Sequence, residues 1–296
     1  MATFILIAGG WQGGWVYQKV ADILVGHGHK VLPITLSGLG DAPAPSANLE
    51  THVSEVVDVV KSHSDDLILV GQSYGGMIVS GVADAVPSRI RSLVYVDAYV
   101  PETGDSVWSL TTPRFRDMFI AGAKGDGLNC APPSNLDPRC RPQPIATFLQ
   151  SITLTERWRD TPRKVFVGAH GWDGSPFLDL FQRLSHETEW STYSLDCGHN
   201  VAKLEPDALA QILLTQTYQP DNHFSRRLSI SAITATRIRR PASVGGFSQQ
   251  PSLHLKSGNR SPPDVLDYPS MGTTRGSPLP KKAYPKSQIS EPHVLS

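Results

Sequence analysis

The chain has 296 residues, of which 40% are hydrophobic and 18% charged, and its 27 Lys and Arg balance its 27 Asp and Glu. A chain of this length can bury a full core without disulfides or metals, and its zero net charge gives no reason to expect a nucleic acid as partner. No apolar run reaches the roughly 18–20 residues that span a bilayer, and the N-terminal run lacks the basic residues and the length of a signal peptide, so we expect a cytoplasmic protein with no membrane partner.

Residues 4–8 form a continuous apolar run that ends in glycines, which is typical of a strand buried on both faces. Similar patterns predict five further strands, at residues 30–36, 67–70, 90–96, 164–168 and 190–195. Apolar residues at helical spacing predict helices at residues 15–26, 49–62, 73–85, 177–184 and 206–214. This alternation predicts an α/β fold, with a mostly parallel sheet of about six strands flanked by helices.

The alternation is interrupted between residues 101 and 161. This stretch is rich in Pro and Gly, shows no strand signal, and has only short helical pieces around residues 108–120 and 145–154. Irregular insertions of about 60 residues are uncommon as plain connections within a compact domain. We therefore expect residues 101–161 to form an irregular, partly helical lid.

The composition changes near residue 217. Residues 217–296 contain 11 Lys and Arg against 4 Asp and Glu, and 10 of the 24 prolines. Few large apolar side chains are available there to offset the entropy lost on ordering. We expect one domain over residues 1–216 and a disordered, basic, Pro- and Ser-rich tail over residues 217–296.

One motif carries nucleophilic chemistry. Gly71-Gln-Ser-Tyr-Gly75 directly follows the predicted strand at residues 67–70 and opens a predicted helix, which is the context that a G-x-S-x-G nucleophile turn requires. Ser73 is then pushed outward at the carboxyl end of the sheet, in front of a helix N-terminus that favours negative charge. We predict Ser73 as the nucleophile.

A serine hydroxyl needs a base, and the base is oriented by an acid. His199 follows the last predicted strand and precedes the last helix, as the chain order serine, acid, histidine requires. Two carboxylates could supply the acid. We favour Asp173, after the strand that follows the lid, and keep Asp97, after the strand that precedes the lid, as the alternative.

The oxyanion of acyl transfer needs two N–H donors. We assign them to the backbone of Tyr74, next to the nucleophile, and of Gly10, in the glycine-rich loop after the first strand. That loop lacks the G-x-G-x-x-G pattern, and the chain shows no phosphate-loop lysine. The three cysteines have no metal-ligand spacing. We therefore expect neither a cofactor nor a metal.

These features resemble the α/β-hydrolase superfamily, and within it the small cofactor-free branch with plant methylesterases, hydroxynitrile lyases and related microbial esterases. The likeness covers residues 3–216 and rests on residues 4–15, 71–77, 95–101 and 197–199. The lyases of this branch carry a threonine at the position of Gly9 and a lysine directly after the catalytic histidine, where this chain has Asn200. Because a neutral Asn cannot hold a cyanide anion as an ammonium does, the resemblance favours ester hydrolysis.

We therefore expect a serine hydrolase that cleaves a small, largely apolar carboxylic ester or a lactone. The alternatives are a hydroxynitrile-lyase-like or other non-hydrolytic biosynthetic enzyme, and a ligand-binding receptor on the same scaffold. A homodimer is an open possibility. The aromatic side chains that we expect to bind substrate are Trp11, Tyr99, Trp108, Phe115 and Phe119.

Overall fold

A computed structural model describes residues 1–64 and 67–217 of the chain. The predicted tail from residue 218 onward lies outside the described residues, so the tail and its boundary with the domain stay predictions. The described residues all fall within one compact unit.

A six-stranded parallel sheet forms the centre of the fold and confirms the predicted α/β architecture. Its spatial order is β2-β1-β3-β4-β7-β8. The strands are β1 (Thr3–Ile7), β2 (Lys30–Ile34), β3 (Leu67–Gln72), β4 (Ile90–Val96), β7 (Arg163–Ala169) and β8 (Trp190–Leu195). The register pairs Gln72 with Val96 and Val96 with Val167. Consequently, the loops that follow β3, β4 and β7 leave the sheet side by side.

The pleat of the sheet divides the core into two layers. In β1, Ile5 and Ile7 belong to one apolar cluster, whereas Phe4 and Leu6 belong to the other, and all four side chains are fully buried. This alternation explains why β1 reads as an unbroken apolar run: both of its faces are covered by helices.

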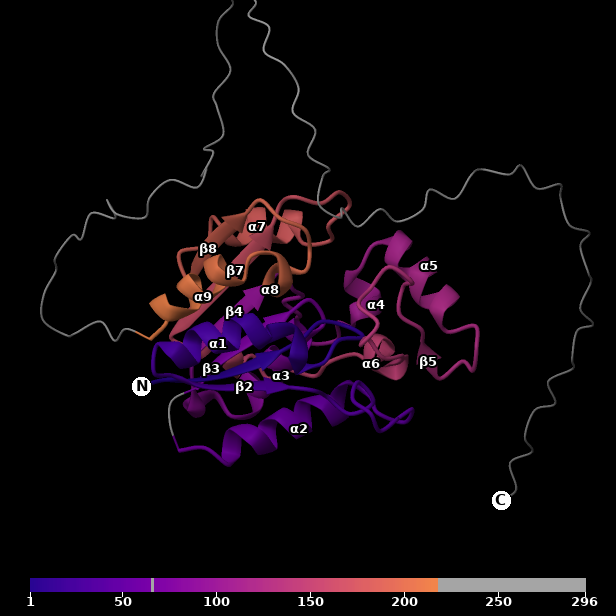
Figure 1. The fold of residues 1–296 in the computed structure, drawn as a ribbon, viewed down its shortest axis with the longest axis horizontal. Helices are drawn as coiled ribbons and strands as arrows, with labels where there is room; N and C mark the ends of the chain where they lie inside the picture. The colour runs from indigo at the N-terminus through magenta and orange to yellow at the C-terminus, as the bar shows by residue number, and fades with distance from the viewer. Residues whose placement is uncertain (65–66, 218–296) are drawn as a thin grey trace, which may run out of the picture. The chain divides into compact units, whose positions relative to one another are not determined.

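Helices cover both faces of the sheet (Figure 1). Helices α1 and α9 pack together over one layer, and α2 and α3 over the other. The helical segments outside the lid are η1 (Gly14–Tyr17), α1 (Gln18–Gly26), α2 (Leu49–Lys61), α3 (Gly75–Ala85), η2 (Pro87–Arg89), α7 (Leu178–Leu184), α8 (Val201–Leu204) and α9 (Pro206–Thr215). Helix α2 begins with a capping box in which the Asn48 side chain accepts the N–H of Thr51, and α9 begins at Pro206, which needs no N–H partner at that position.

The lid lies at the carboxyl end of β1, away from the N-terminus (Figure 1). It contains α4 (Val107–Leu110), α5 (Pro113–Gly122), β5 (Asn129–Cys130), β6 (Gln143–Pro144), α6 (Ala146–Leu149) and η3 (Arg157–Asp160). Helices α4 and α5 are the short helical pieces expected around residues 108–120, and Pro113 starts the second of them. The expectation of no strand was wrong, since β5 and β6 pair antiparallel; two-residue strands are too short to produce a periodic pattern.

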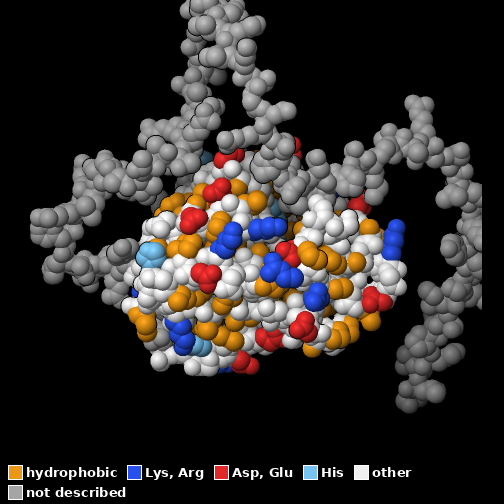
Figure 2. Space-filling model, in the orientation of Figure 1, with side chains coloured by type: hydrophobic (Ala, Val, Ile, Leu, Met, Phe, Trp, Pro, Cys, Tyr) orange, Lys and Arg blue, Asp and Glu red, His pale blue; other side chains and the backbone are white. Residues whose placement is uncertain are grey.

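On the face shown in Figure 2, basic and acidic side chains lie interspersed among apolar ones. No helix in the described part of the chain combines the length and the apolar character needed to cross a membrane.

Candidate active site

Ser73 lies in the turn between β3 and α3, half-buried and with a backbone φ of +52°. Close backbone contacts explain the two glycines that flank it. A Cβ atom at Gly71 would lie 2.4 Å from the carbonyl oxygen of Gly75, and one at Gly75 would lie 2.6 Å from that of Ile7. The motif therefore folds as the sharp strand-to-helix turn that the sequence predicted, with Ser73 at the carboxyl edge of the sheet.

His199 is paired with Asp97. The Nδ1 atom of His199 lies 2.7 Å from Oδ2 of Asp97, whose carboxylate is 1% exposed at the end of β4. An ionised carboxylate only accepts hydrogen bonds, so Nδ1 carries the proton. In the neutral imidazole, Nε2 is then the unprotonated nitrogen that a general base needs.

The structure does not support our preference for Asp173 as the acid. The Asp173 side chain is exposed, and the hydrogen bond to His199 comes from Asp97, the alternative. The end of β7 and the loop after it instead supply donors: the Ala169 N–H donates to Oδ1 of Asp97 and the Trp172 indole N–H to Oδ2, each at 3.1 Å. Because β4 and β7 are neighbours, both loops reach the same place, and strand order alone could not choose between them.

The loop that carries His199 is tied to the nucleophile turn. The side-chain amide of Gln72, directly before Ser73, donates to the His199 carbonyl oxygen at 3.0 Å. The imidazole lies between two aromatic rings, at 4.9 Å from Trp172 and at 5.6 Å from Phe177. Within residues 1–64 and 67–217 no hydrogen bond joins the Ser73 hydroxyl to the imidazole; such catalytic contacts often tighten only in the Michaelis complex.

The two predicted oxyanion donors, Tyr74 and Gly10, each lie next to a residue that is Ser73 or contacts it. Tyr74 is the N-cap of α3, where the first N–H groups have no acceptor within the helix. The glycine-rich loop after β1 packs against Ser73: a Cβ atom at Gly9 would lie 3.1 Å from Cβ of Ser73. Gly10 therefore directly follows Gly9, which packs against Ser73.

The lid holds this loop in place, which the sequence did not reveal. The fully buried Gln143 accepts the backbone N–H of Trp11 at 2.9 Å, and the Arg141 N–H donates to the Trp11 carbonyl oxygen at 2.9 Å. The Trp11 indole N–H donates to the carbonyl oxygen of Cys130, also at 2.9 Å. Trp11 has a φ of +65°, a conformation that needs such restraint.

A second buried contact supports the nucleophile turn from the other side. The Nδ1 atom of His52 lies 2.9 Å from the Tyr74 hydroxyl, and its Nε2 lies 2.9 Å from the Ser37 carbonyl oxygen. Because that carbonyl can only accept, Nε2 carries the proton and Tyr74 donates to Nδ1. Burial lowers the pKa of His52 and raises the pKa of Tyr74, so both groups are neutral.

The alpha/beta hydrolase family matches residues 4–212. The chain belongs to this family. This hydrolase is 37% identical over 238 residues to a carbendazim-hydrolysing esterase from a Nocardioides strain, which covers 72% of this chain and 98% of that protein.

Two other relatives are more distant. An α-hydroxynitrile lyase from Arabidopsis thaliana is 31% identical over 105 residues, which covers 34% of this chain and 41% of that protein. Among solved structures, an extracellular α/β-hydrolase from a Paenibacillus species superposes with a TM-score of 0.64 at 21% identity, covering 73% of this chain and 99% of that one. The structural likeness confirms the fold.

Three of the five aromatic side chains predicted to bind substrate lie together in the hydrolase. Phe119 lies between Trp11, at a ring distance of 6.0 Å, and Phe115, at 6.5 Å. Tyr99 packs on Phe177 at 4.8 Å, beside the imidazole. The indole of Trp108 is partly buried against the same apolar cluster and lies 5.7 Å from the guanidinium of Arg116.

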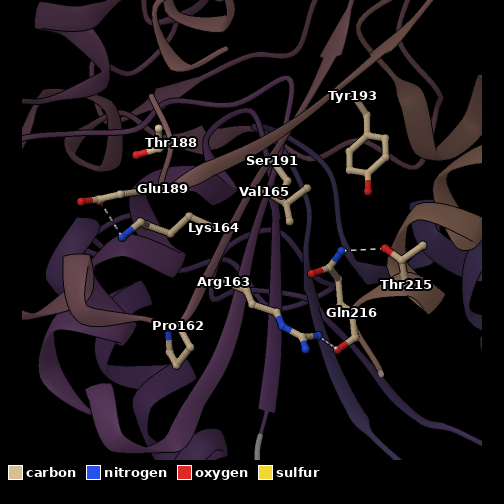
Figure 3. A pocket seen from close by; sticks show the side chains of 10 residues that line it. All are labelled: Pro162, Arg163, Lys164, Val165, Thr188, Glu189, Ser191, Tyr193, Thr215 and Gln216. Carbon is tan, nitrogen blue, oxygen red and sulfur yellow. Dashed lines mark hydrogen bonds and ion pairs between the residues drawn. The ribbon is translucent and has the colours of Figure 1, made fainter. Parts of the chain in front are cut away.

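A separate groove of about 570 Å³ opens at the opposite end of the strands, by the amino ends of β7 and β8 (Figure 3). Its polar side chains are largely paired with one another or with backbone: Lys164 forms an ion pair with Glu189 at 3.1 Å, and Arg163 donates to the Gln216 carbonyl oxygen. The groove lies at the amino ends of the strands, whereas Ser73 lies at their carboxyl ends. The groove is therefore not the place where Ser73 could meet an acyl group.

Proposed function

We propose that the chain is a serine hydrolase of small, largely apolar carboxylic esters or lactones, with Ser73 as nucleophile, His199 as base and Asp97 as acid. The observation that carries this proposal is the buried His199–Asp97 hydrogen bond beside a serine on a strand-to-helix turn. The carbendazim-hydrolysing esterase from Nocardioides supports an esterase activity for this chain, since the likeness covers 98% of that relative.

The reaction is acyl transfer to water. Ser73 Oγ attacks the ester carbonyl while His199 Nε2 takes the hydroxyl proton; the tetrahedral oxyanion collapses, and Nε2 returns the proton to the leaving alkoxide. Water then attacks the acyl-enzyme by the same steps in reverse order. Asp97 holds Nδ1 at 2.7 Å and stabilises the imidazolium that forms in each half-reaction.

The oxyanion accepts the N–H groups of Gly10 and Tyr74. Loss of one such donor costs about 10²–10³ in rate, or roughly 3–4 kcal/mol. The contacts of Gln143 and Cys130 with Trp11 support this assignment, because they restrain the residue next to Gly10.

The walls of the proposed acyl site are aromatic. Trp11, Phe115 and Phe119 come from the loop after β1 and the lid, and Trp172 and Phe177 flank the imidazole. Such a site favours a planar or apolar group over a charged one. A cytoplasmic location and a homodimer stay predictions.

A lyase is the second candidate, because the Arabidopsis relative is named as one. Cyanohydrin cleavage must hold a cyanide anion near His199, and the next residue here is Asn200, which carries no charge. Release of cyanide and aldehyde from a cyanohydrin, without hydrolysis of any ester, would favour the lyase.

The deciding experiment is turnover of a panel of short p-nitrophenyl esters and lactones by Ser73→Ala. We expect turnover and fluorophosphonate labelling to disappear while the circular dichroism spectrum stays unchanged. The matched control is Ser185→Ala, which removes an exposed hydroxyl that bonds only local groups. Wild-type turnover in Ser73→Ala would overturn the proposal.

A further inference from the structure

The carboxylate of Asp97 is held by three donors. Oδ1 accepts the Ala169 N–H at 3.1 Å. Oδ2 accepts both the His199 Nδ1–H at 2.7 Å and the Trp172 indole N–H at 3.1 Å. The oxygen that orients the imidazole is therefore shared with the indole of Trp172.

The same indole also touches the base and the lid. Its ring lies 4.9 Å from the imidazole of His199, and the edge contact with Phe115 of α5 is at 6.3 Å with the planes at 89°. Trp172 is half-buried, between the lid and the triad. One side chain thus contacts both partners of the hydrogen-bonded pair, and a residue of the lid.

Asp97 needs external restraint. Its φ of +44° is unusual for a residue with a side chain, and its own N–H is fixed on the Val167 carbonyl oxygen at 2.7 Å. Rotation of a carboxylate about its last torsion is soft, so the backbone alone does not set the plane of the two oxygens. Donors on both oxygens set that plane.

We propose that Trp172 is a positioning residue of the triad, whose indole N–H fixes Oδ2 of Asp97 and withdraws part of its negative charge. This inference rests on the proposed serine-hydrolase function. The indole N–H is bonded to Asp97 and therefore acts through Asp97 on His199. Because the indole shares Oδ2 with His199, it weakens the attraction between the carboxylate and the imidazolium that forms during the reaction.

The other titratable groups around the pair do not take this role. Cys197 lies two residues before His199, and burial together with the charges of Glu205, Asp97 and Asp196 raises the pKa of its thiol to about 12. Burial raises the pKa of Tyr99, and the negative charge of Asp97 adds to that rise. Both stay neutral over the working range, while Asp196 and Glu205 are acceptors rather than donors.

The test is the pH profile of kcat/KM for Trp172→Phe, which keeps an aromatic ring and removes the indole N–H. We expect kcat to fall about tenfold, as for the loss of a hydrogen bond to a charged group. The acid limb of the profile should move to higher pH, because Asp97 then holds the imidazolium more strongly. A purely structural role for the ring would leave this limb in place.

The matched control is Trp190→Phe. Trp190 is the first residue of β8, so it lies at the amino end of that strand and away from the carboxyl ends that carry the triad. Its ring packs on Tyr95 at 5.5 Å. We expect it to lose stability with an unchanged profile. An unchanged acid limb and a kcat within twofold of wild type in Trp172→Phe would overturn the proposal.

If Trp172→Phe does not fold, the hydrogen bond between Trp172 and Asp97 can be tested by NMR in protein that keeps Trp172. The chain has six tryptophans, so its ¹H–¹⁵N spectrum has six indole signals. Asp97→Asn should shift the Trp172 signal, and an unshifted signal would refute the bond. If Ser73→Ala keeps wild-type turnover, the proposed function fails; if Ser73→Ala is inactive and Trp172→Phe has a wild-type profile, only the role of Trp172 fails.

Discussion

The sharpest prediction compares Asp97→Asn with Asp173→Asn. An asparagine at position 97 has one acceptor oxygen where the carboxylate has two, and three donors converge on it. If the amide oxygen faces His199 and Trp172, the NH₂ group opposes the Ala169 N–H. If the amide is flipped, the NH₂ group faces Nδ1, and the imidazole must place its proton on Nε2, which destroys the base.

Either arrangement leaves at least one buried donor unpaired, at about 1–3 kcal/mol of stability each. The flipped arrangement is the one that stops catalysis, and the same change in a serine-protease triad lowers kcat by about 10⁴. We expect a loss of about 10³–10⁴ in kcat on a short p-nitrophenyl ester for Asp97→Asn. Asp173 is exposed, so Asp173→Asn should stay within twofold of wild type.

The assay is steady-state hydrolysis from pH 5 to 9, with urea unfolding to separate lost stability from lost chemistry. The assignment of Asp97 as the acid would be refuted if Asp97→Asn kept more than a tenth of wild-type kcat while Asp173→Asn lost most of it. Asp173, which the sequence favoured, would then be the acid.

Three further predictions concern the supports of the site. Gln143→Met should lower kcat about tenfold with little change in KM, because it leaves the buried Trp11 N–H without its acceptor, whereas Gln150→Met should not; equal kinetics would show that the lid does not hold the oxyanion loop. Gly75→Ala should destabilise the fold by about 3 kcal/mol or more in urea unfolding, since its Cβ would lie 2.6 Å from a carbonyl oxygen, and a wild-type midpoint would contradict the packing of the turn. Burial lowers the pKa of His52, so the unfolded chain binds this proton more readily and stability should fall as the pH drops below about 6.5, by at most about 1.4 kcal/mol per pH unit. His52→Gln should flatten that slope between pH 5 and 6.5, and an unaltered slope would assign it to other groups.

The fold was predictable because parallel strands that are buried on both faces appear in the sequence as continuous apolar runs. The apolar run of β1 and the glycines around Ser73 each have one physical reading, burial in one case and close backbone approach in the other. An irregular, partly helical lid was predicted too, but not its internal elements, because Pro113 and two-residue strands produce no period long enough to place them.

The acid was the limit of prediction within the site. Asp97 and Asp173 both follow neighbouring strands, and the choice depends on side-chain direction, which strand order does not encode. Gln143 and Trp172 were out of reach for a different reason. Their roles consist of hydrogen bonds to residues 132 and 75 positions away, and no local pattern marks such pairs.

The contacts of Trp11 have a consequence for engineering substrate preference. Two segments of the insertion hold this one residue by three hydrogen bonds, one through Cys130 and the other through Arg141 and Gln143. Exchanging the whole of residues 101–161 with a relative would therefore disturb the reaction centre along with the choice of substrate. A chimaera limited to α4 and α5 keeps the three hydrogen bonds of Trp11 and alters the aromatic side chains that those helices contribute to the proposed site.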